Sequence, residues 1–258
     1  MIRRISEIKK YKEMLYNLTL YDLRTRYKGS VLGFLWTFLN PLLMLGVYYV
    51  VFSTVMKVDI DNYFIYIFVG LLPWLNFQST IVQGASSIVG NSNLIKKIYF
   101  PREIIPLSII MGGFVNYFFG FFILFPFLFL LPLDWWNILL WFPIILIIQF
   151  LFTLGLVFIL SAMTVFFRDI THILTVLLSA WFYFTPIMYP ESYIPKEYLL
   201  LFNLNPLKSL INLYQDIFFY GKPPDIQVII VLFISSVTLC LAGWKLFDVL
   251  SKKFAEEI

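Results

Sequence analysis

Six long stretches of the chain carry no charged residue, and the charged residues gather between them. The stretches cover residues 29–56, 62–95, 104–133, 135–167, 170–190 and 226–244. Each exceeds the ~18 residues that indicate a membrane span. None shows the alternating pattern of a barrel strand, and a spanning backbone must satisfy its own hydrogen bonds in a helix or a closed barrel. The pattern therefore predicts an all-α polytopic membrane protein, a single transmembrane domain over residues 1–258 with six transmembrane helices.

Composition and the sidedness of charge sharpen this picture. The chain is 60% hydrophobic and only 13% charged, against roughly 25% charged residues in a soluble domain. With both termini on one side of a six-span arrangement, that side holds 15 of the 19 Lys and Arg residues. The positive-inside rule therefore predicts cytosolic termini. The net charge of +4 largely follows from this asymmetry, so no nucleic-acid partner is expected.

The N-terminal arm, residues 1–28, is basic and has an apolar stripe at helical spacing. Its members are Ile5, Ile8, Tyr11, Leu15 and Leu18. This pattern predicts an amphipathic interface helix on the cytosolic surface of the membrane. The helix would serve as a surface anchor and topology signal, or it would take part in docking or gating.

A second connection, residues 84–105, predicts a two-turn cytosolic helix that Asn91 or Ser92 caps and Pro101 ends. Its apolar side chains need a cover of membrane or protein. A partner's groove would supply that cover, and an interfacial position against lipid headgroups is the alternative. The side chains that such a helix presents are Leu94, Ile95, Ile98, Tyr99 and Phe100, beside Lys96, Lys97 and Arg102.

The third connection, residues 188–225, is rich in proline and predicts short half-helices between spans five and six. Asn205 and Pro206 are typical of an N-cap and first helical position, and Gly221 of a helix stop. The intervening helix of about 15 residues, roughly 22 Å, is too short to cross the membrane. It would dip into the outer leaflet as a gate, or lie at the interface. Its apolar face holds Leu207, Leu210, Ile211, Tyr214, Ile217 and Phe218, with Lys208 and Asp216 as a charged pair.

Residues typical of catalysis or energy conversion are scarce. His172 and Cys240 are the single histidine and cysteine and lie in different segments, so no metal site and no catalytic residue are predicted. Gly221 and Lys222 precede a proline, which rules out a phosphate-binding P-loop there. The six stretches hold none of the acids that ion-coupled transporters bury. Energy for transport would have to come from another subunit.

Aromatic residues are abundant, with 29 Phe, 16 Tyr and 7 Trp. Tyr and Trp offer flat apolar faces with a polar edge, which suits sugar rings moving through a pore. Membrane-belt or core packing is the alternative for each of them. The candidate pore aromatics are Tyr48, Tyr49, Tyr63, Tyr66, Trp74 and Phe77.

Several motifs, in the same order along the chain, resemble the ABC-2-type permeases that export polysaccharides such as O-antigen and teichoic acid. The first is RTRYKGSVLGFLWTFLNPLL at 24–43. The others are GLLPWLNF at 70–77, LIKKIYFPREIIPLS at 94–108, FRDI at 167–170, FYFTPIMYP at 182–190 and NPLKSLINLYQDIFFYG at 205–221.

This resemblance implies a homodimer in the cytoplasmic (inner) membrane that binds two cytosolic ATPase subunits. ATP and Mg²⁺ would then lie on the partner chain, and this chain would need no cofactor. The segment 94–100 resembles the family's coupling helix, with Lys97 and Arg102 beside it, and the arm resembles its interface helix. The gate would include Asn205, Pro206, Leu210, Tyr214 and Phe218, and a lipid-linked glycan would place its diphosphate near Arg24, Arg26 and Lys28.

Two other functions remain open from the sequence. One is an ABC-2 exporter of a lipid or drug, which the aromatic richness and the lack of a large extracellular domain disfavour. The other is a membrane-embedded glycosyl- or acyltransferase, which the lack of carboxylate or histidine clusters disfavours. The exported glycan could be O-antigen, capsule or teichoic acid.

Overall fold

The computed structural model describes residues 7, 9–26 and 28–257, and every regular element in them is helical. The α-helices are α2 (Lys12–Thr25), α3 (Trp36–Val50), α4 (Tyr63–Gly90), α5 (Ser92–Lys97), α6 (Ile104–Leu128), α7 (Trp135–Phe166), α8 (Ile170–Tyr183), α9 (Leu199–Asn203), α10 (Pro206–Phe218), α11 (Ile226–Ser251) and α12 (Phe254–Glu257). Shorter 3-10 helices lie at η1 (Gly33–Leu35), η3 (Glu191–Tyr193) and η4 (Lys196–Tyr198), and a π-helical turn at η2 (Val51–Val55).

Five segments of the described chain are long and apolar enough to cross a membrane, which confirms the helical polytopic class. They are Gly33–Val55, Tyr63–Lys97, Ile104–Leu128, Trp135–Phe166 and Ile226–Ser251. The remaining expected span is a shorter apolar helix, α8. Its 14 residues cover about 21 Å, less than a ~30 Å hydrocarbon core. Pro186 explains the early end, since proline disfavours helical backbone at the residue before it.

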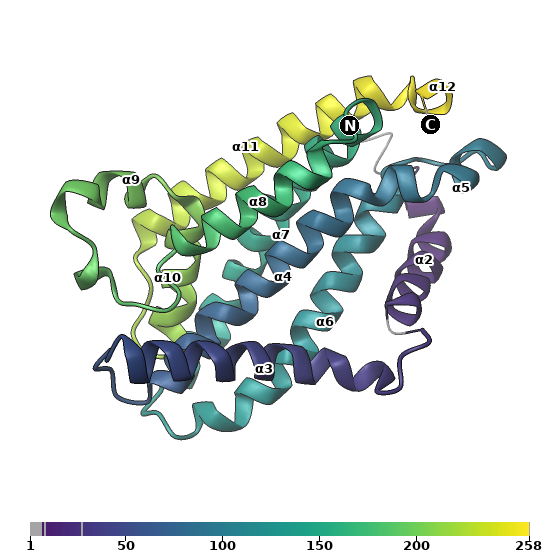
Figure 1. The fold of residues 1–258 in the computed structure, drawn as a ribbon. Coiled ribbons are helices and arrows are strands. Elements are labelled where there is room, and N and C mark those ends of the chain that lie inside the picture. The colour runs from purple at the N-terminus through teal and green to yellow at the C-terminus, as the bar shows by residue number, and fades with distance from the viewer. Residues whose placement is uncertain (1–6, 8, 27, 258) are drawn as a thin grey trace.

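The helices α4, α6, α7, α8 and α11 run alongside one another, and α3 crosses the outside of this bundle (Figure 1). The backbones of α7 and α11 approach each other closely where Gly155 meets Gly243. A Cβ added to Gly243 would lie 2.4 Å from the carbonyl oxygen of Gly155. Small residues allow this contact, as is typical where transmembrane helices cross.

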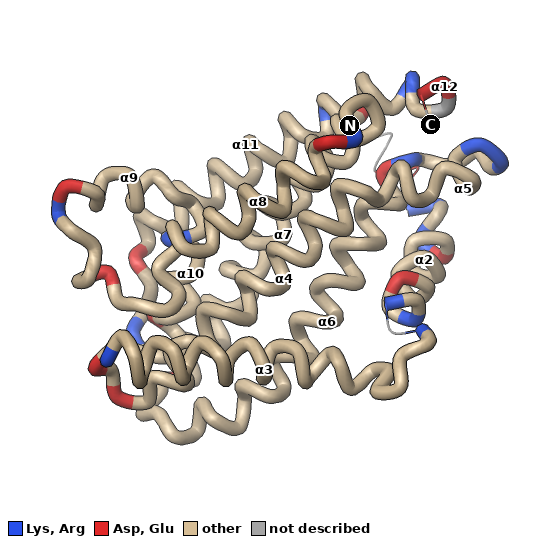
Figure 2. The backbone as a smooth tube through the Cα atoms, in the orientation of Figure 1, with Lys and Arg blue, Asp and Glu red and all other residues tan. Residues whose placement is uncertain are grey.

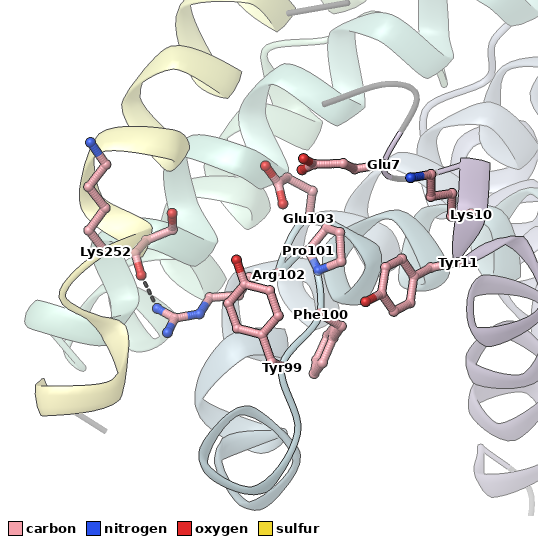
Figure 3. A pocket seen from close by; sticks show the side chains of 10 residues that line it. Glu7, Lys10, Tyr11, Tyr99, Phe100, Pro101, Arg102, Glu103 and Lys252 are labelled. Atoms are coloured by element: carbon pink, nitrogen blue, oxygen red, sulfur yellow. Dashed lines mark hydrogen bonds between the residues drawn. The ribbon is translucent and has the colours of Figure 1, made fainter. Parts of the chain in front are cut away.

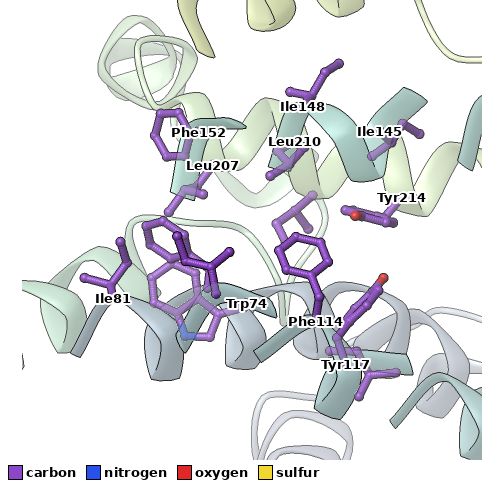
Figure 4. Packing of buried hydrophobic residues seen from close by; sticks show 14 of the residues in the cluster. Trp74, Ile81, Phe114, Tyr117, Ile145, Ile148, Phe152, Leu207, Leu210 and Tyr214 are labelled. Atoms are coloured by element: carbon purple, nitrogen blue, oxygen red, sulfur yellow. The ribbon is translucent and has the colours of Figure 1, made fainter. Parts of the chain in front are cut away.

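Helix α4 lies at the centre of the core. The centre of the Trp74 ring in α4 lies 5.5 Å from that of Phe182 in α8. The centre of the Phe77 ring in α4 lies 5.7 Å from that of Trp181 in α8. These contacts join α4 to the inner face of α8. Figure 4 shows Trp74 in the same buried cluster as residues from α6, α7 and α10. Helix α3, in contrast, leaves most of its apolar surface uncovered in the single chain.

Charged residues lie at the two ends of the bundle, and the long helices between them are almost free of charge (Figure 2). We define the basic end as the end that bears α5, α12 and the start of α2, with Lys96, Lys97, Arg102, Lys252 and Lys253. The opposite end bears α9 and α10 and is called the α10 end (Figure 1).

Candidate coupling loop and gate helix

The helix expected at the basic end is shorter than predicted. Helix α5 stops at Lys97, and Ile98 has extended backbone angles of φ −131° and ψ 137°. The chain leaves the helix because Ile95 and Phe100 are both buried, and an extended path brings both side chains into the core. Asn91 stands at the N-cap position without capping, since its side chain instead donates to the Ser87 carbonyl oxygen at 2.8 Å.

Only part of the expected coupling surface faces outward. Ile98 is 55% exposed and Tyr99 is 95% exposed. Lys96 and Lys97 are exposed beside them, and Leu94 is half-buried. The accessible apolar surface therefore consists of Ile98 and Tyr99 rather than one face of a two-turn helix. We call residues 91–103, which include α5, the coupling loop.

Beside the coupling loop lies a cavity of about 390 Å³. Three segments far apart in the sequence form its wall: the arm, the coupling loop and the C-terminal end of α11 (Figure 3). Arg102 crosses it and donates a hydrogen bond to the carbonyl oxygen of Ser251. The lining residues are Glu7, Lys10, Tyr11, Tyr99, Phe100, Pro101, Arg102, Glu103, Ser251 and Lys252.

The stripe of the N-terminal arm has a protein neighbour. Tyr11, Leu15 and Leu18 are half-buried and pack against the hydrophobic core, because α2 lies along α6. The expected position of this helix on the cytosolic surface of the membrane stays a prediction. Ile5 and Ile8 lie outside the described residues.

The three basic residues expected to meet a diphosphate differ in their surroundings. Arg26 is tied to Asp22 at 2.6 Å, and the two side chains are only 12% and 13% exposed. Arg24 and Lys28 are exposed. Asp22 was not predicted as a partner of Arg26, although its spacing of four residues is typical of a helical ion pair.

The half-helix at the α10 end is confirmed, and Asn205 caps it. The Asn205 Oδ1 accepts from the Leu207 N–H at 3.0 Å and from Trp181 Nε1 at 2.8 Å. Its Nδ2 donates at 3.0 Å to both the Phe184 carbonyl oxygen and Thr185 Oγ1. One side chain thus starts α10 and fastens it to the end of α8.

Helix α10 has 13 residues and is buried along most of its length, on more than the one face that the sequence predicted. Of the expected gate residues, Leu210, Tyr214 and Phe218 lie in the core, while Asn205 and Pro206 are half-buried at the start. The buried residues are Leu207, Lys208, Leu210, Ile211, Leu213, Tyr214, Gln215, Ile217 and Phe218. The helix ends before Gly221, whose φ of +63° suits glycine.

A buried glutamine, Gln149 of α7, joins α10 to the centre of the bundle. Its Oε1 accepts a hydrogen bond from the Tyr214 hydroxyl, and its Nε2 donates to the Pro73 carbonyl oxygen at 3.1 Å. Gln149 was not among the residues predicted from the sequence. An amide in the middle of a largely apolar span was the available signal, because such a group requires partners in hydrocarbon.

The two charged residues expected on α10, Lys208 and Asp216, both lie on this helix but do not pair with each other. Lys208 instead binds Glu191 at 2.6 Å and also donates to Asn203. Asp216 binds Lys222 at 3.1 Å. The eight-residue separation of Lys208 and Asp216 corresponds to about 12 Å along a helix, so each side chain pairs with a residue outside α10.

The candidate pore aromatics divide into two groups. Tyr49 is 39% exposed on α3, and Tyr48 is half-buried against Phe182 at 5.3 Å. The other four are buried within the chain: Tyr63, Tyr66, Trp74 and Phe77. In addition, the Tyr63 hydroxyl donates to the Met188 carbonyl oxygen, and the Tyr66 hydroxyl to that of Tyr189 at 3.2 Å.

Among the described residues, no group of three or more His, Cys, Asp or Glu side chains could hold a metal ion. Residues 14–219 match the family model described as ABC-2 type transporter. The chain belongs to the ABC-2 type transporter family. The match includes both the coupling loop and α10 of this ABC-2 chain.

Curated relatives of this ABC-2 chain carry names from polysaccharide export. It is 40% identical to the O-antigen export system permease protein RfbA of Myxococcus xanthus over the full length of both chains. A protein of the same name from Klebsiella pneumoniae is 36% identical over 95% of this chain and 94% of its own. The polysialic acid transport protein KpsM of Escherichia coli is 25% identical over 77% of this chain and 78% of its own.

Proposed function

We propose that this chain is the membrane-spanning permease subunit of an ABC transporter that exports a lipid-linked, O-antigen-like polysaccharide. The observation that carries the proposal is the 36–40% identity, over nearly the whole chain, to relatives named as O-antigen export permeases. The more distant relative is named for transport of another polysaccharide. The cytoplasmic membrane is the expected location, since lipid-linked glycans are made on its inner leaflet.

The basic end is the side that meets the motor. Ile98 and Tyr99 expose apolar surface beside the exposed Lys96 and Lys97. Such surface favours a covering protein partner. A separate ATPase chain with its own ATP and Mg²⁺ fits this role, and the basic end is then cytosolic by the positive-inside rule.

The substrate would approach from the same side. Arg24 and Lys28 are exposed there and free to meet a diphosphate headgroup, whereas Arg26 is already held by Asp22. The uncovered faces of α3 and α8 are where a second copy would pack, and the glycan would pass between the two copies. Tyr49 can face that passage as it stands, while Trp74 and Phe77 reach it only if the helices around them separate.

Helix α10 is suited to gating because its 13 residues are too few to cross a ~30 Å hydrocarbon core. It is also fastened to α8 and α7 by hydrogen bonds, and Gln149 continues this connection to α4. Movement of those spans would carry α10 with them. This chain would contribute no chemical step, and hydrolysis of ATP would take place on the partner.

The test is to tag this chain, express it with its candidate ATPase, extract the complex in detergent, and measure subunit stoichiometry and ATP hydrolysis. A complex of two permease and two ATPase chains with ATP turnover supports the proposal. A chain that purifies alone, with no nucleotide-binding partner under any condition that keeps it folded, contradicts it and favours the transferase hypothesis.

A further inference from the structure

The coupling loop is fastened to the C-terminal end of the chain. The Arg102 guanidinium donates to the Ser251 carbonyl oxygen (Figure 3). Ser251 is the last residue of α11, where helix carbonyls lack intrahelical partners and a cation is favoured by the helix dipole. The same guanidinium carbon lies 5.8 Å from the centre of the Phe254 ring, within the distance of a cation–π interaction.

Phe254 is itself held between two spans. Its ring is fully buried, 5.4 Å from the ring of Phe247 in α11 and 6.4 Å from that of Phe166 in α7. Helix α12 has only four residues, too few for a helix to be stable without tertiary contacts. The buried ring therefore sets where this segment lies.

These contacts connect the ends of three spans, α6, α7 and α11. Arg102 lies two residues before α6 begins at Ile104, Phe166 is the last residue of α7, and Ser251 is the last residue of α11. We call Arg102, Ser251 and Phe254, with Phe166 and Phe247, the C-terminal clasp. The link between α5 and α6, residues 98–101, has extended backbone at Ile98 and is held by the buried Phe100, and the clasp fastens its far end at Arg102.

We propose that the C-terminal clasp positions the coupling loop so that it moves as one body with α6, α7 and α11. Rigid secondary elements and packed side chains carry coupling between distant sites. A push from the ATPase on Ile98 and Tyr99 then reaches the spans instead of bending the loop. This proposal rests on the proposed function for the identity of the motor, while the clasp itself is a property of this chain.

The first experiment replaces Phe254 with alanine in the permease–ATPase complex and measures glycan exported per ATP hydrolysed. We expect this ratio to fall about 3- to 30-fold, with ATP turnover and complex formation kept. Phe254→Tyr retains the ring and should restore the ratio. Phe233→Ala is the matched control, because Phe233 is on the same helix α11 as Phe247 but 42% exposed and remote from the clasp.

A second variant and a second measurement cover the case in which Phe254→Ala fails to fold. Arg102→Gln leaves the aromatic packing in place and removes only the guanidinium contacts, and it should lower the ratio as well. Hydrogen exchange of the backbone amides of residues 98–100, 102 and 103 in the isolated permease should then rise by about an order of magnitude, without a rise in α10.

The outcomes separate the two proposals. A normal export ratio in both variants, or unchanged exchange at residues 98–100, 102 and 103, overturns the clasp. A wild-type complex that moves no glycan overturns the proposed function, and the exchange measurement still decides whether the clasp holds the loop.

Discussion

The coupling loop and α10 are both short apolar segments between spans, yet they differ in how far their apolar side chains are buried. The coupling loop leaves Ile98 and Tyr99 exposed, while α10 buries nine of its 13 residues. Exposed apolar groups at the edge of a bundle favour a partner, whereas buried ones set position within the subunit. Under the proposed function, the basic end would receive the force of the ATPase and the α10 end would move with the spans.

Polar contacts reinforce this difference. At α10, Asn205, Tyr214 and Lys208 each bind side chains of other segments. At the coupling loop, Ile98 and Tyr99 are exposed, and Arg102 makes the connection to α11. The comparison therefore predicts that substitutions at α10 lower stability, and that substitutions of Ile98 and Tyr99 lower partner binding.

The largest expected effect lies between the two ends, where Gly243 meets Gly155. Gly243→Ala would place a methyl group 2.4 Å from a backbone oxygen, so α7 and α11 must separate. We expect a loss of about 3 kcal/mol or more in stability, measured by thermal unfolding in detergent. Gly46→Ala is the matched control, since nothing lies within 4 Å of its added Cβ. Gly46→Ala should raise stability by about 0.5–1 kcal/mol. Equal effects of Gly243→Ala and Gly46→Ala would contradict the close contact of α7 with α11.

The next largest effect is on partner binding. Replacing both Ile98 and Tyr99 with alanine should weaken binding of the ATPase about 10- to 100-fold, because both side chains are exposed and available to it. The unfolding temperature of the isolated chain should not change. Ile147→Ala, with a similar exposed fraction of 52% on α7, should leave binding intact. If the double variant lowers the stability of the chain instead of its binding to the ATPase, Ile98 and Tyr99 stabilise the fold rather than bind a partner.

The ion pair of Lys208 should respond unequally to loss of either member. The Lys208 side chain is 4% exposed and that of Glu191 is 46% exposed. Glu191→Gln leaves a buried cation without its carboxylate, at an expected cost on the order of 2 kcal/mol. Lys208→Met leaves a solvated carboxylate and should cost less than about 1 kcal/mol. Thermal unfolding of both variants decides this, and a larger loss for Lys208→Met would contradict the asymmetry.

The smallest effect concerns one hydroxyl. Tyr214→Phe leaves Gln149 Oε1 without its donor in a buried site and should cost about 1 kcal/mol. The same change at the exposed Tyr99 should alter stability by less than about 0.5 kcal/mol. Thermal unfolding of the two variants in parallel measures the difference in stability. If Tyr214→Phe leaves stability unchanged, the hydrogen bond to Gln149 does not hold α10 in place.

Features written in local sequence could be predicted. Charge-free windows identify the membrane-crossing helices, because lipid demands long apolar segments. Asn205, Pro206 and Gly221 give the start and stop of α10, since capping and positive φ are properties of single residues. The same local logic places a helix at α5.

Features that depend on residues far away in the sequence could not be predicted. Nothing near Ile98 in the sequence shows that Phe100 is drawn into the core and ends α5 early. The bond from Arg102 to Ser251 joins residues 149 positions apart, and that from Gln149 to Pro73 joins residues 76 apart. Burial of Trp74 and Phe77 also depends on how α8 packs, which residue type alone does not set.

The most direct test of the account is export itself. The purified permease and ATPase are placed in vesicles with a lipid-linked glycan, and glycan that becomes accessible on the far side is measured with and without ATP. The account predicts ATP-dependent appearance of glycan that is lost when Ile98 and Tyr99 are alanine and kept in Ile147→Ala. Equal appearance without ATP, or none from a complex that hydrolyses ATP, would contradict it.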